Sequence, residues 1–291
     1  MNSSPRSNDP LALLIDCLRA TWGTGRRWTP GEATWAVTTD GQMHRVESLG
    51  AGVCWLRPHD VVIVATTIEE ANEGLRLARR SPVQISGADE TLRFAADRAG
   101  WRPLVGASFD LDLRLGAAHA EPPALPAGYR IRSATAADDL VGIHRASWSP
   151  PQLPFAEEGR PAIDPDATSS FDARLLDAVQ AAEGYELAAH LVAEAPDATL
   201  AASCIAWHDP SIDLTSIDLT SIEPLGVDPE HRRLGLAGAL ALAVADQARD
   251  RGIAEVVIHP RGDAAYPAPR RAYRRVGFVA VDRADLYVAL R

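Results

Sequence analysis

The amino-acid sequence predicts an α/β (α+β) fold arranged in two domains, an expectation that rests on three observations. Short apolar runs typical of strands alternate along the chain with longer segments of helical periodicity. The 291 residues exceed the usual length of a single domain. The stretch GAAHAEPPALPAG is rich in alanine and proline and lacks apolar periodicity. We therefore expect domains at residues 1–115 and 129–291, joined by a linker at residues 116–128.

The C-terminal part of the chain predicts a regular succession of elements. A strand at Tyr129–Arg132 precedes a helix that begins near Ala136, where Asp138 and Asp139 favour a helix start. A polar, proline-rich loop follows at residues 149–166. The later expected elements are a helix at Ser169–Ala182, strands at Leu187–Ala193, Leu200–His208 and Ser221–Val227, a helix at Leu234–Arg251 stopped by Gly252, a strand at Ala254–His259, a short helix at Pro269–Arg275 and a final strand pair.

The pentapeptide SIDLT occurs twice in tandem from Ser211 to Thr220. Two copies are too few for a solenoid. Apolar and polar residues alternate in them, so we expect a duplication within a hairpin loop that extends the flanking strands.

The N-terminal part repeats some of this order. Its expected elements are helices at Leu11–Ala20, Ile68–Arg79 and Asp89–Arg98, and strands at Thr34–Thr38, within Val53–Thr67, at VQIS and at about Ala107–Leu115. The segment LRFAADRAGW also matches RRAYRRVGF in spacing. An ancient duplication of one fold and an unrelated α/β cap both account for this pattern.

Composition narrows the classes of protein. No apolar run approaches the roughly 18–20 residues of a membrane helix, and the start MNSSPRSNDP lacks the apolar core of a signal peptide. We therefore expect a cytoplasmic protein without a membrane partner. Cys17, Cys54 and Cys204 are scattered and odd in number, which favours reduced, buried thiols over disulfides or a metal site.

Charge is unevenly distributed. The net charge is −10, and all 29 basic residues are arginines, which excludes chemistry that needs a lysine. Residues 231–291 contain 11 arginines and 6 acidic residues, so the remainder is strongly acidic. An acidic body argues against nucleic acid as a partner. A basic C-terminal segment suits a compact anionic ligand, although an arginine-rich solvated helix face gives the same count.

The strongest local pattern is EPLGVDPEHRRLGLAGAL. A strand leads into a turn that opens a long helix, and unpaired N–H groups at a helix start favour phosphate oxygens. Gly235 and Ala237 permit a close approach of the backbone, and Arg232 and Arg233 offer charge-assisted hydrogen bonds.

A second pattern, AYRRVGF, lies about 40 residues downstream, at Ala272 to Phe278. Together, R-x-x-G-x-A after V-x-P and this Y-x-x-x-G-F resemble the two cofactor motifs of the GNAT superfamily of N-acyltransferases. The opening YRIRSATAADD resembles the first strand and helix of that family. The resemblance covers residues 129–291.

The resemblance implies a mixed, mostly antiparallel sheet flanked by helices and splayed between its fourth and fifth strands, with acetyl-CoA in the cleft. The pyrophosphate is expected on the turn, and a backbone N–H at Gly226 or Val227 is expected to stabilise the oxyanion. Tyr273 is expected to protonate the leaving thiolate. The expected cofactor-binding residues are Gly226, Val227, Arg232, Arg233, Leu234, Gly235, Leu236, Ala237 and Gly238.

The sequence indicates the general base less clearly than it indicates the cofactor-binding residues. Glu223 lies on the strand that enters the turn, and its side chain faces the cleft if that strand is regular. A structural carboxylate is the alternative. His208, His231 and Asp218 are further possibilities, each more typical of a structural role.

Two features depart from the family pattern. Tyr266 stands where many relatives carry asparagine, and nearby prolines shorten the following helix. The N-terminal half has EEANEGLRLARR where a phosphate turn is expected, and Ala96 where Tyr273 stands in the other half. This half therefore resembles a degenerate, non-catalytic copy of the kind found in tandem GNAT proteins.

The expected function is acetyl-CoA:amine N-acetyltransfer by direct attack, without a metal. A non-catalytic acyl-CoA-binding or partner-interaction module of the same fold is the alternative. The acidic body favours a cationic acceptor, which is a small molecule or a peptide. The protein is expected to be a monomer or a homodimer.

Overall fold

The computed structural model describes residues 9–21, 28–40, 44–79, 81–121, 123–209 and 219–290. By its contacts the chain divides into two compact units. The first unit holds the described residues up to Asp112 and those from Val281 onward, and the second holds the described residues from Leu113 to Ala280. The division expected from the sequence, at residues 116–128, stays a prediction. Most of the tandem SIDLT copies, at residues 211–218, lie outside the described residues.

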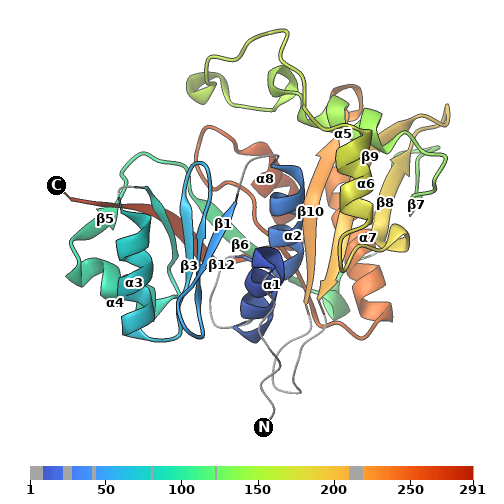
Figure 1. Ribbon diagram of the computed structural model, residues 1–291. Helices are drawn as coiled ribbons and strands as arrows, with labels where there is room; N and C mark the ends of the chain where they lie inside the picture. The colour runs from blue at the N-terminus through green and yellow to red at the C-terminus, as the bar shows by residue number, and fades with distance from the viewer. Residues whose placement is uncertain are drawn as a thin grey trace. The chain divides into compact units, whose positions relative to one another are not determined.

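The first unit has the order helix, helix, three strands, helix, strand, helix, strand (Figure 1). These elements are α1 (Pro10–Ala20), α2 (Pro30–Thr39), β1 (Arg45–Ser48), β2 (Val53–Leu56), β3 (Val61–Val64), α3 (Ile68–Ala78), β4 (Val83–Ser86), α4 (Glu90–Arg98) and β5 (Trp101–Pro103). The strand order is β1-β2-β3-β4-β12, with β5 paired to β12. Only β3 and β4 run parallel in this sheet.

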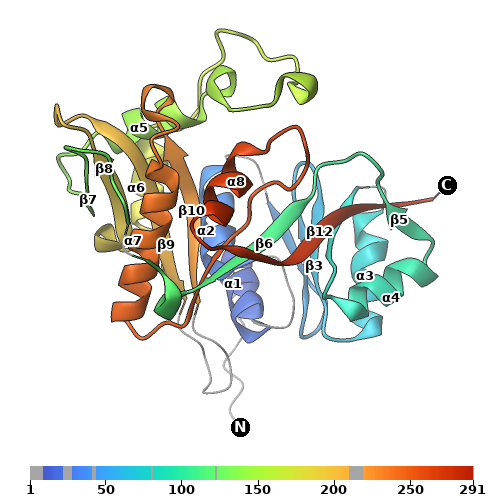
Figure 2. The same cartoon turned by 180° about the vertical axis from the view of Figure 1, so that it is seen from behind.

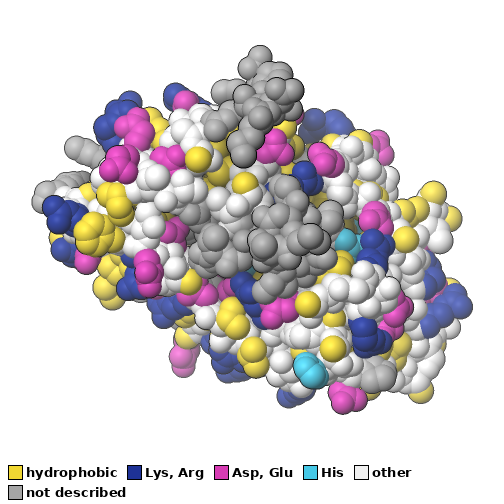
Figure 3. Space-filling view, turned by 90° about the horizontal axis from the view of Figure 1, so that it is seen from below, with side chains coloured by type: hydrophobic (Ala, Val, Ile, Leu, Met, Phe, Trp, Pro, Cys, Tyr) yellow, Lys and Arg dark blue, Asp and Glu magenta, His cyan; other side chains and the backbone are white. Residues whose placement is uncertain are grey.

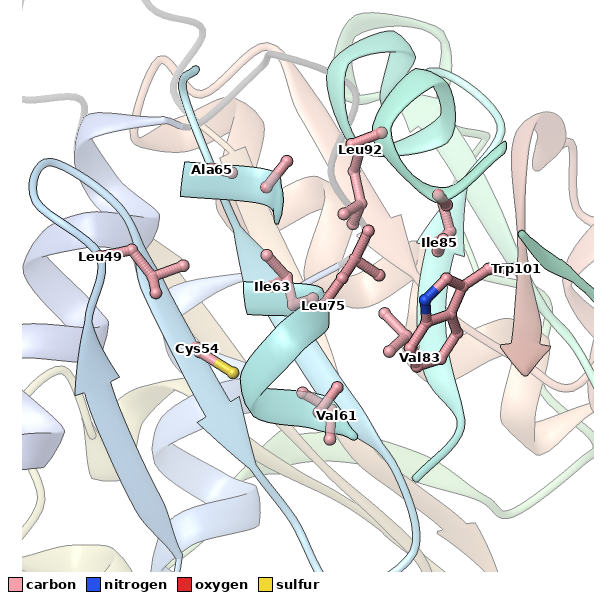
Figure 4. Packing of buried hydrophobic residues seen from close by; sticks show 14 residues of the cluster. Leu49, Cys54, Val61, Ile63, Ala65, Leu75, Val83, Ile85, Leu92 and Trp101 are labelled. Carbon is pink, nitrogen blue, oxygen red and sulfur yellow. The ribbon is translucent and has the colours of Figure 1, made fainter. Parts of the chain in front are cut away.

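Alternating side chains of the central strands build two cores in the first unit. Cys54, Val61 and Ile63 face one side, where they pack with α3 and α4 (Figure 4). Trp55 and Val62 face the other side, where they pack with α1 and α2. Because strand side chains alternate with a period of two, both faces of this sheet are buried by helices.

The second unit follows the same order after two strands at its start, β6 and β7 (Figure 2). Its principal elements are β6 (Asp110–Gly116), β7 (Arg130–Ser133), α5 (Leu140–Trp148), α6 (Ala173–Gln180), β8 (His190–Glu194), β9 (Leu200–Asp209), β10 (Leu219–Val227), α7 (Leu236–Asp250), β11 (Glu255–Ile258), α8 (Ala268–Arg275) and β12 (Val279–Ala289). Its short 3₁₀ turns are η1 (Ala117–His119), η2 (Pro150–Gln152), η3 (Glu157–Gly159), η4 (Leu187–Ala189) and η5 (Pro229–His231). The strand order is β6-β11-β10-β9-β8-β7, and only β10 and β11 run parallel.

The chain exchanges strands between the two units. Strand β6 follows the elements of the first unit, yet its residues Leu113–Gly116 pair with β11 in the second. Strand β12 follows the elements of the second unit, yet its residues Ala284–Tyr287 pair with β4 in the first. Each sheet is therefore completed by a strand that follows the other half of the sequence.

Comparison with the expected elements confirms the fold class and the mostly antiparallel sheets and corrects two details. The expected strand at Thr34–Thr38 is wrong, because this segment lies in α2. There Thr29 and Glu32 form a reciprocal capping box and Pro30 takes the first helical turn. The expected final pair of strands is also wrong, because β12 is one continuous strand. Strands β1 and β5 were not expected.

On the face drawn in Figure 3, arginine and acidic side chains of the described residues are interspersed rather than gathered by sign. Over the same residues, no helix has the length and apolar character that crossing a membrane requires. No group of three or more histidine, cysteine or acidic side chains within the described ranges has an arrangement that could hold a metal ion.

Candidate active site

Strand β10 has an open edge within the sheet of the second unit. Its parallel pairing with β11 covers only Leu219–Ser221, whereas its pairing with β9 continues to Val227. A one-residue bulge lies between Ile222 and Leu225. Beyond Ser221 the two parallel strands therefore separate, and the β11 side of β10 has no strand partner among the described residues.

The orientation of the peptide groups on this edge follows from one hydrogen bond. The N–H of Asp228 donates to the carbonyl of Ala201 in β9, at 2.9 Å. Because successive residues of a strand direct their N–H and C=O groups to opposite sides, the groups of Val227 face away from β9. The N–H of Gly226 faces β9. Of the two expected oxyanion donors, Val227 is thus the one on the open edge.

The turn between β10 and α7 leaves a cluster of amides at the helix start. Gly235 caps α7 with a φ of 86° and supplies no side-chain cap. The first intrahelical bond runs from the N–H of Ala239 to the carbonyl of Gly235, at 3.0 Å. The N–H groups of Leu236, Ala237 and Gly238 precede that bond, so they have no acceptor within the helix. Such a cluster favours an anion.

The side chains of this turn have different surroundings. Arg233 has a φ of 64° and is exposed, and Leu234 is 42% exposed. Leu236 is buried, which anchors the first turn of α7 in the core. A Cβ at Gly238 would lie 2.7 Å from Val276, so this glycine permits α7 to pack against α8. The turn thus presents its main-chain amides beside the exposed side chain of Arg233.

Arg232 behaves differently from its neighbour. Its guanidinium donates to the main-chain carbonyls of Val227 (3.2 Å), Ser147 (3.3 Å) and Gln152. These contacts leave the side chain directed at the protein's own backbone rather than at solvent.

Tyr273 lies in α8 and is 4% exposed, with its ring centroid 6.0 Å from that of Phe278. Burial raises the pKa of the Tyr273 phenol well above its usual range, and the charge of nearby Glu223 adds to this effect. Tyr273 therefore keeps its proton at neutral pH and is available as a donor.

Glu223 lies in the bulge of β10 and is partly exposed. The expected regular alternation of this strand does not hold there. The Trp207 indole N–H donates to the Glu223 carbonyl at 2.6 Å, which fixes the backbone of the bulge. The electrostatic influence of the Glu223 carboxylate on Tyr273 brings the two expected catalytic side chains into one neighbourhood.

Two of the alternative bases have other environments, and Asp218 lies outside the described residues. His208 lies beside Thr220, with Nδ1 2.8 Å from the threonine hydroxyl, and burial lowers the pKa of the imidazole to about 4. His231 is bonded through Nδ1 to the Tyr129 hydroxyl at 2.9 Å.

Aromatic and arginine side chains surround Tyr266. Its ring centroid lies 4.9 Å from that of Phe155, and the Arg261 guanidinium lies over both rings, at 5.7 Å and 5.6 Å. The Ala156 N–H donates to the Ala265 carbonyl at 2.8 Å, so the two loops carrying this group are tied together. The contributions of Phe155 and Arg261 were not expected, because both lie in loops without periodic pattern.

The first unit closes its corresponding turn with its own carboxylate. Glu70 in α3 accepts the N–H groups of Ala51 (2.6 Å), Gly52 (3.1 Å) and Thr66 (2.7 Å). Burial alone would raise the pKa of Glu70, but these hydrogen bonds and that of the Thr66 hydroxyl outweigh it and lower the pKa to about 2. Thr67 caps the same helix. The Thr67 hydroxyl also accepts the Glu70 N–H at the start of α3, whereas the start of α7 in the second unit has no side-chain cap.

The parallel strands of the first unit also separate, but side chains fill the space between them. Pairing of β3 with β4 covers only Val61–Val83 and Val62–Gln84. A cavity of about 20 Å³ remains there, lined by Leu18, Trp28, Val62, Ile63, Val64, Gln84, Ser86, Asp89 and Leu92. This volume is far below the several hundred Å³ of a typical ligand pocket.

Comparison with known proteins agrees with the motifs of the second unit. Residues 155–278 match the family model described as the acetyltransferase (GNAT) family. The chain contains a GNAT domain. The open edge of β10, the turn before α7 and Tyr273 all lie within the matched residues. A comparison with curated proteins finds no match.

Solved structures of GNAT proteins share the fold of the whole chain. A GCN5-related N-acetyltransferase from Sphaerobacter thermophilus is 16% identical, with a TM-score of 0.54 over 97% of this chain and 93% of that one. A tandem GNAT protein from the clavulanic acid biosynthesis pathway is 16% identical, with a TM-score of 0.55 over 97% and 95%. A GNAT-family acetyltransferase from Colwellia psychrerythraea is 10% identical, with a TM-score of 0.60 over 96% and 97%. At these identities the likeness concerns the fold.

Proposed function

We propose that the protein is an acetyl-CoA-dependent N-acetyltransferase in which a primary amine attacks the thioester directly. The observation that carries this proposal is the amide cluster at the start of α7 next to the open edge of β10. The amides of Leu236, Ala237 and Gly238 would bind the pyrophosphate oxygens. The edge of β10 beyond Ser221, which β11 no longer covers, would accommodate the extended pantetheine arm.

The catalytic groups would act in sequence around the thioester carbonyl. Glu223 takes a proton from the incoming ammonium, directly or through water, and the amine nitrogen forms a bond to the carbonyl carbon. The Val227 N–H stabilises the resulting oxyanion. As the carbon–sulfur bond breaks, the nitrogen gives up its remaining extra proton to solvent, the thiolate takes the Tyr273 hydroxyl proton, and the tyrosine recovers a proton from solvent. Glu223 then returns its proton to solvent.

The buried cysteine of the second unit supports direct transfer rather than an acyl-enzyme. Cys204 in β9 exerts an electrostatic influence on Tyr273, and burial raises the pKa of its thiol to about 12. Only a thiolate is an effective nucleophile, so this side chain is a poor carrier of the acetyl group at neutral pH.

The acceptor remains the open part of the proposal. The net charge of −10 favours a cationic primary amine, either a small molecule or a peptide. We also propose that the protein acts in the cytoplasm, as a monomer or a homodimer, and without nucleic acid or membrane partners.

A screen of primary amines with acetyl-CoA, read by release of free thiol, tests this function. We expect at least one cationic amine to release CoA stoichiometrically with its acetylated product. Binding of acetyl-CoA without release by any amine would instead favour the non-catalytic acyl-CoA-binding module.

A further inference from the structure

The side chain of Arg232 holds three separate elements by their main-chain oxygens. Its Nε–H donates to Val227 at the end of β10, and its two terminal nitrogens donate to Ser147 in α5 and Gln152 in η2. No ion pair of this guanidinium with a carboxylate is found within the described residues. A planar guanidinium carries its donors in a fixed fork, so it can donate to three acceptors at once in a defined geometry. The ammonium group of a lysine is a point charge on a flexible chain and fixes that geometry less well.

Two of the three carbonyls, those of Val227 and Ser147, lie where secondary structure leaves them without partners. The Val227 carbonyl faces the open edge of β10, where β11 no longer pairs. Ser147 lies in the last turn of α5, where carbonyls lack intrahelical donors and the helix dipole favours a cation. Burial lowers the pKa of Arg232, so these dipoles stabilise a charge that is partly removed from water.

This contact lies next to the expected oxyanion donor. The N–H and C=O of a strand residue point to the same side, so Arg232 binds the carbonyl of the residue whose N–H lines the open edge. The same stretch is packed closely from α5, because a Cβ at Gly226 would lie 2.6 Å from that of Ser147. Since β9 supports this end of β10 on one side only, Arg232 supplies the support on the other.

We propose that Arg232 is a positioning residue, which fixes the Val227 peptide for catalysis and does not bind the cofactor phosphates. This inference rests on the proposed function and refines it, because the sequence pattern alone assigns Arg232 to the pyrophosphate. Arg233, which is exposed one position later, is then the arginine of the turn that faces an anionic ligand.

Neighbouring variants separate the two roles. Arg232→Gln is expected to lower kcat about 10- to 100-fold, because a small displacement of a catalytic group is costly, while the KM for acetyl-CoA stays within about threefold. Arg233→Gln is expected to raise that KM, most strongly at low salt, with kcat unchanged. Arg249→Gln, in an exposed pair with Asp246, controls for loss of charge and is expected to match the wild type.

Hydrogen exchange tests the inference without any substrate. Arg232→Gln is expected to speed amide exchange across residues 225–228, whereas Arg233→Gln leaves it unchanged. Arg232→Lys keeps the charge but not the fork, so it is expected to show the same defects to a lesser degree and serves if the glutamine variant does not fold. A raised KM with unchanged kcat and unchanged exchange in the Arg232 variants would overturn the inference. A wild-type protein that acetylates no amine would refute the proposed function alone, since the exchange experiment still decides the role of Arg232.

Discussion

The phenol of Tyr273 is buried and lies within electrostatic influence of the Glu223 carboxylate, and both features oppose its ionisation. A proton donor must be protonated when the thiolate leaves, and a raised pKa ensures this over the whole pH range in which amines are good nucleophiles. The same raised pKa makes the phenol a weaker acid, so its contribution depends on close contact with the sulfur. At the scale of a residue, the role of a single atom can be tested with an isosteric substitution that removes it.

Tyr273→Phe removes only the hydroxyl and is expected to lower kcat with little change in acetyl-CoA affinity. General acid catalysis contributes roughly 10²–10⁴-fold where proton transfer limits the rate. Because the pKa of Tyr273 is raised, the wild-type rate is not expected to fall with deprotonation of this residue up to about pH 10. Steady-state rates with a good acceptor at saturation measure the effect. Equal rates for both proteins across acceptors and pH would show that the ring only packs.

Glu223→Gln is expected to lower kcat/KM about 100-fold at neutral pH, where the amine must lose a proton before attack. The deficit is expected to shrink as the pH approaches the pKa of the acceptor, near 10 for an alkyl amine, because the free amine then needs no base. A pH–rate profile of both proteins measures this. A deficit of constant size at every pH would assign Glu223 a structural role.

At the scale of elements, α7 connects the turn after β10 with the core. Its two ends carry glycines of positive φ, Gly235 at 86° and Gly252 at 77°, and a Cβ at either would contact nothing within 4 Å. Backbone strain on substitution is therefore similar at both ends, and only the first end lies in the amide cluster. Substitution of Gly252 is therefore a matched control for the same substitution of Gly235.

Gly235→Val is expected to abolish acetyl-CoA binding, whereas Gly252→Val is expected to retain it. Both variants place a β-branched residue in a left-handed conformation, so a comparable loss of stability is expected in each. Calorimetric titration, with circular dichroism to verify folding, measures the difference. Similar affinities in the two folded variants would remove the phosphate role of the turn.

Glu70 tests the claim that the first unit closes its own turn. Glu70→Gln removes the carboxylate that accepts the N–H groups of Ala51, Gly52 and Thr66. We expect the free energy of unfolding to fall by about 1–2 kcal/mol as a result. The folded-state pKa of about 2 is below the unfolded value, so this contribution is present above about pH 4.5 and is lost as the pH falls toward 2. Denaturant unfolding from pH 7 to pH 3 measures it. Glu73→Gln, at an exposed position of the same helix paired with Arg76, is the control; equal behaviour of the two variants would contradict the account.

Sequence periodicity predicted most of the helices and strands, and the wrong predictions have physical reasons. The segment Thr34–Thr38 has β-branched residues typical of strands, but the cap at Thr29 and tertiary packing make it helical. At the site, spacing located the turn and Tyr273. The bulge at Glu223 is a backbone irregularity, and two of the carbonyl contacts of Arg232 are made with residues 80 and 85 positions away in the chain. Local sequence patterns encode neither feature.

At the scale of the whole molecule, two units of similar element order differ in what they leave open. The second leaves the amides at the start of α7 and a strand edge available. In the first, Thr67 caps the start of α3, the Glu70 carboxylate accepts the neighbouring Thr66 N–H, and side chains around Trp28 fill the space between the parallel strands. The exchange of β6 and β12 makes each sheet depend on a strand from the other half of the chain. The first unit is therefore expected to be required for folding of the second while binding no cofactor itself.

Calorimetric titration of acetyl-CoA into the intact chain tests the central claim most directly. The account predicts one binding site per chain, with micromolar affinity, that disappears in Gly235→Val and persists in Glu70→Gln. Two sites per chain, or a single site that survives Gly235→Val, would contradict it.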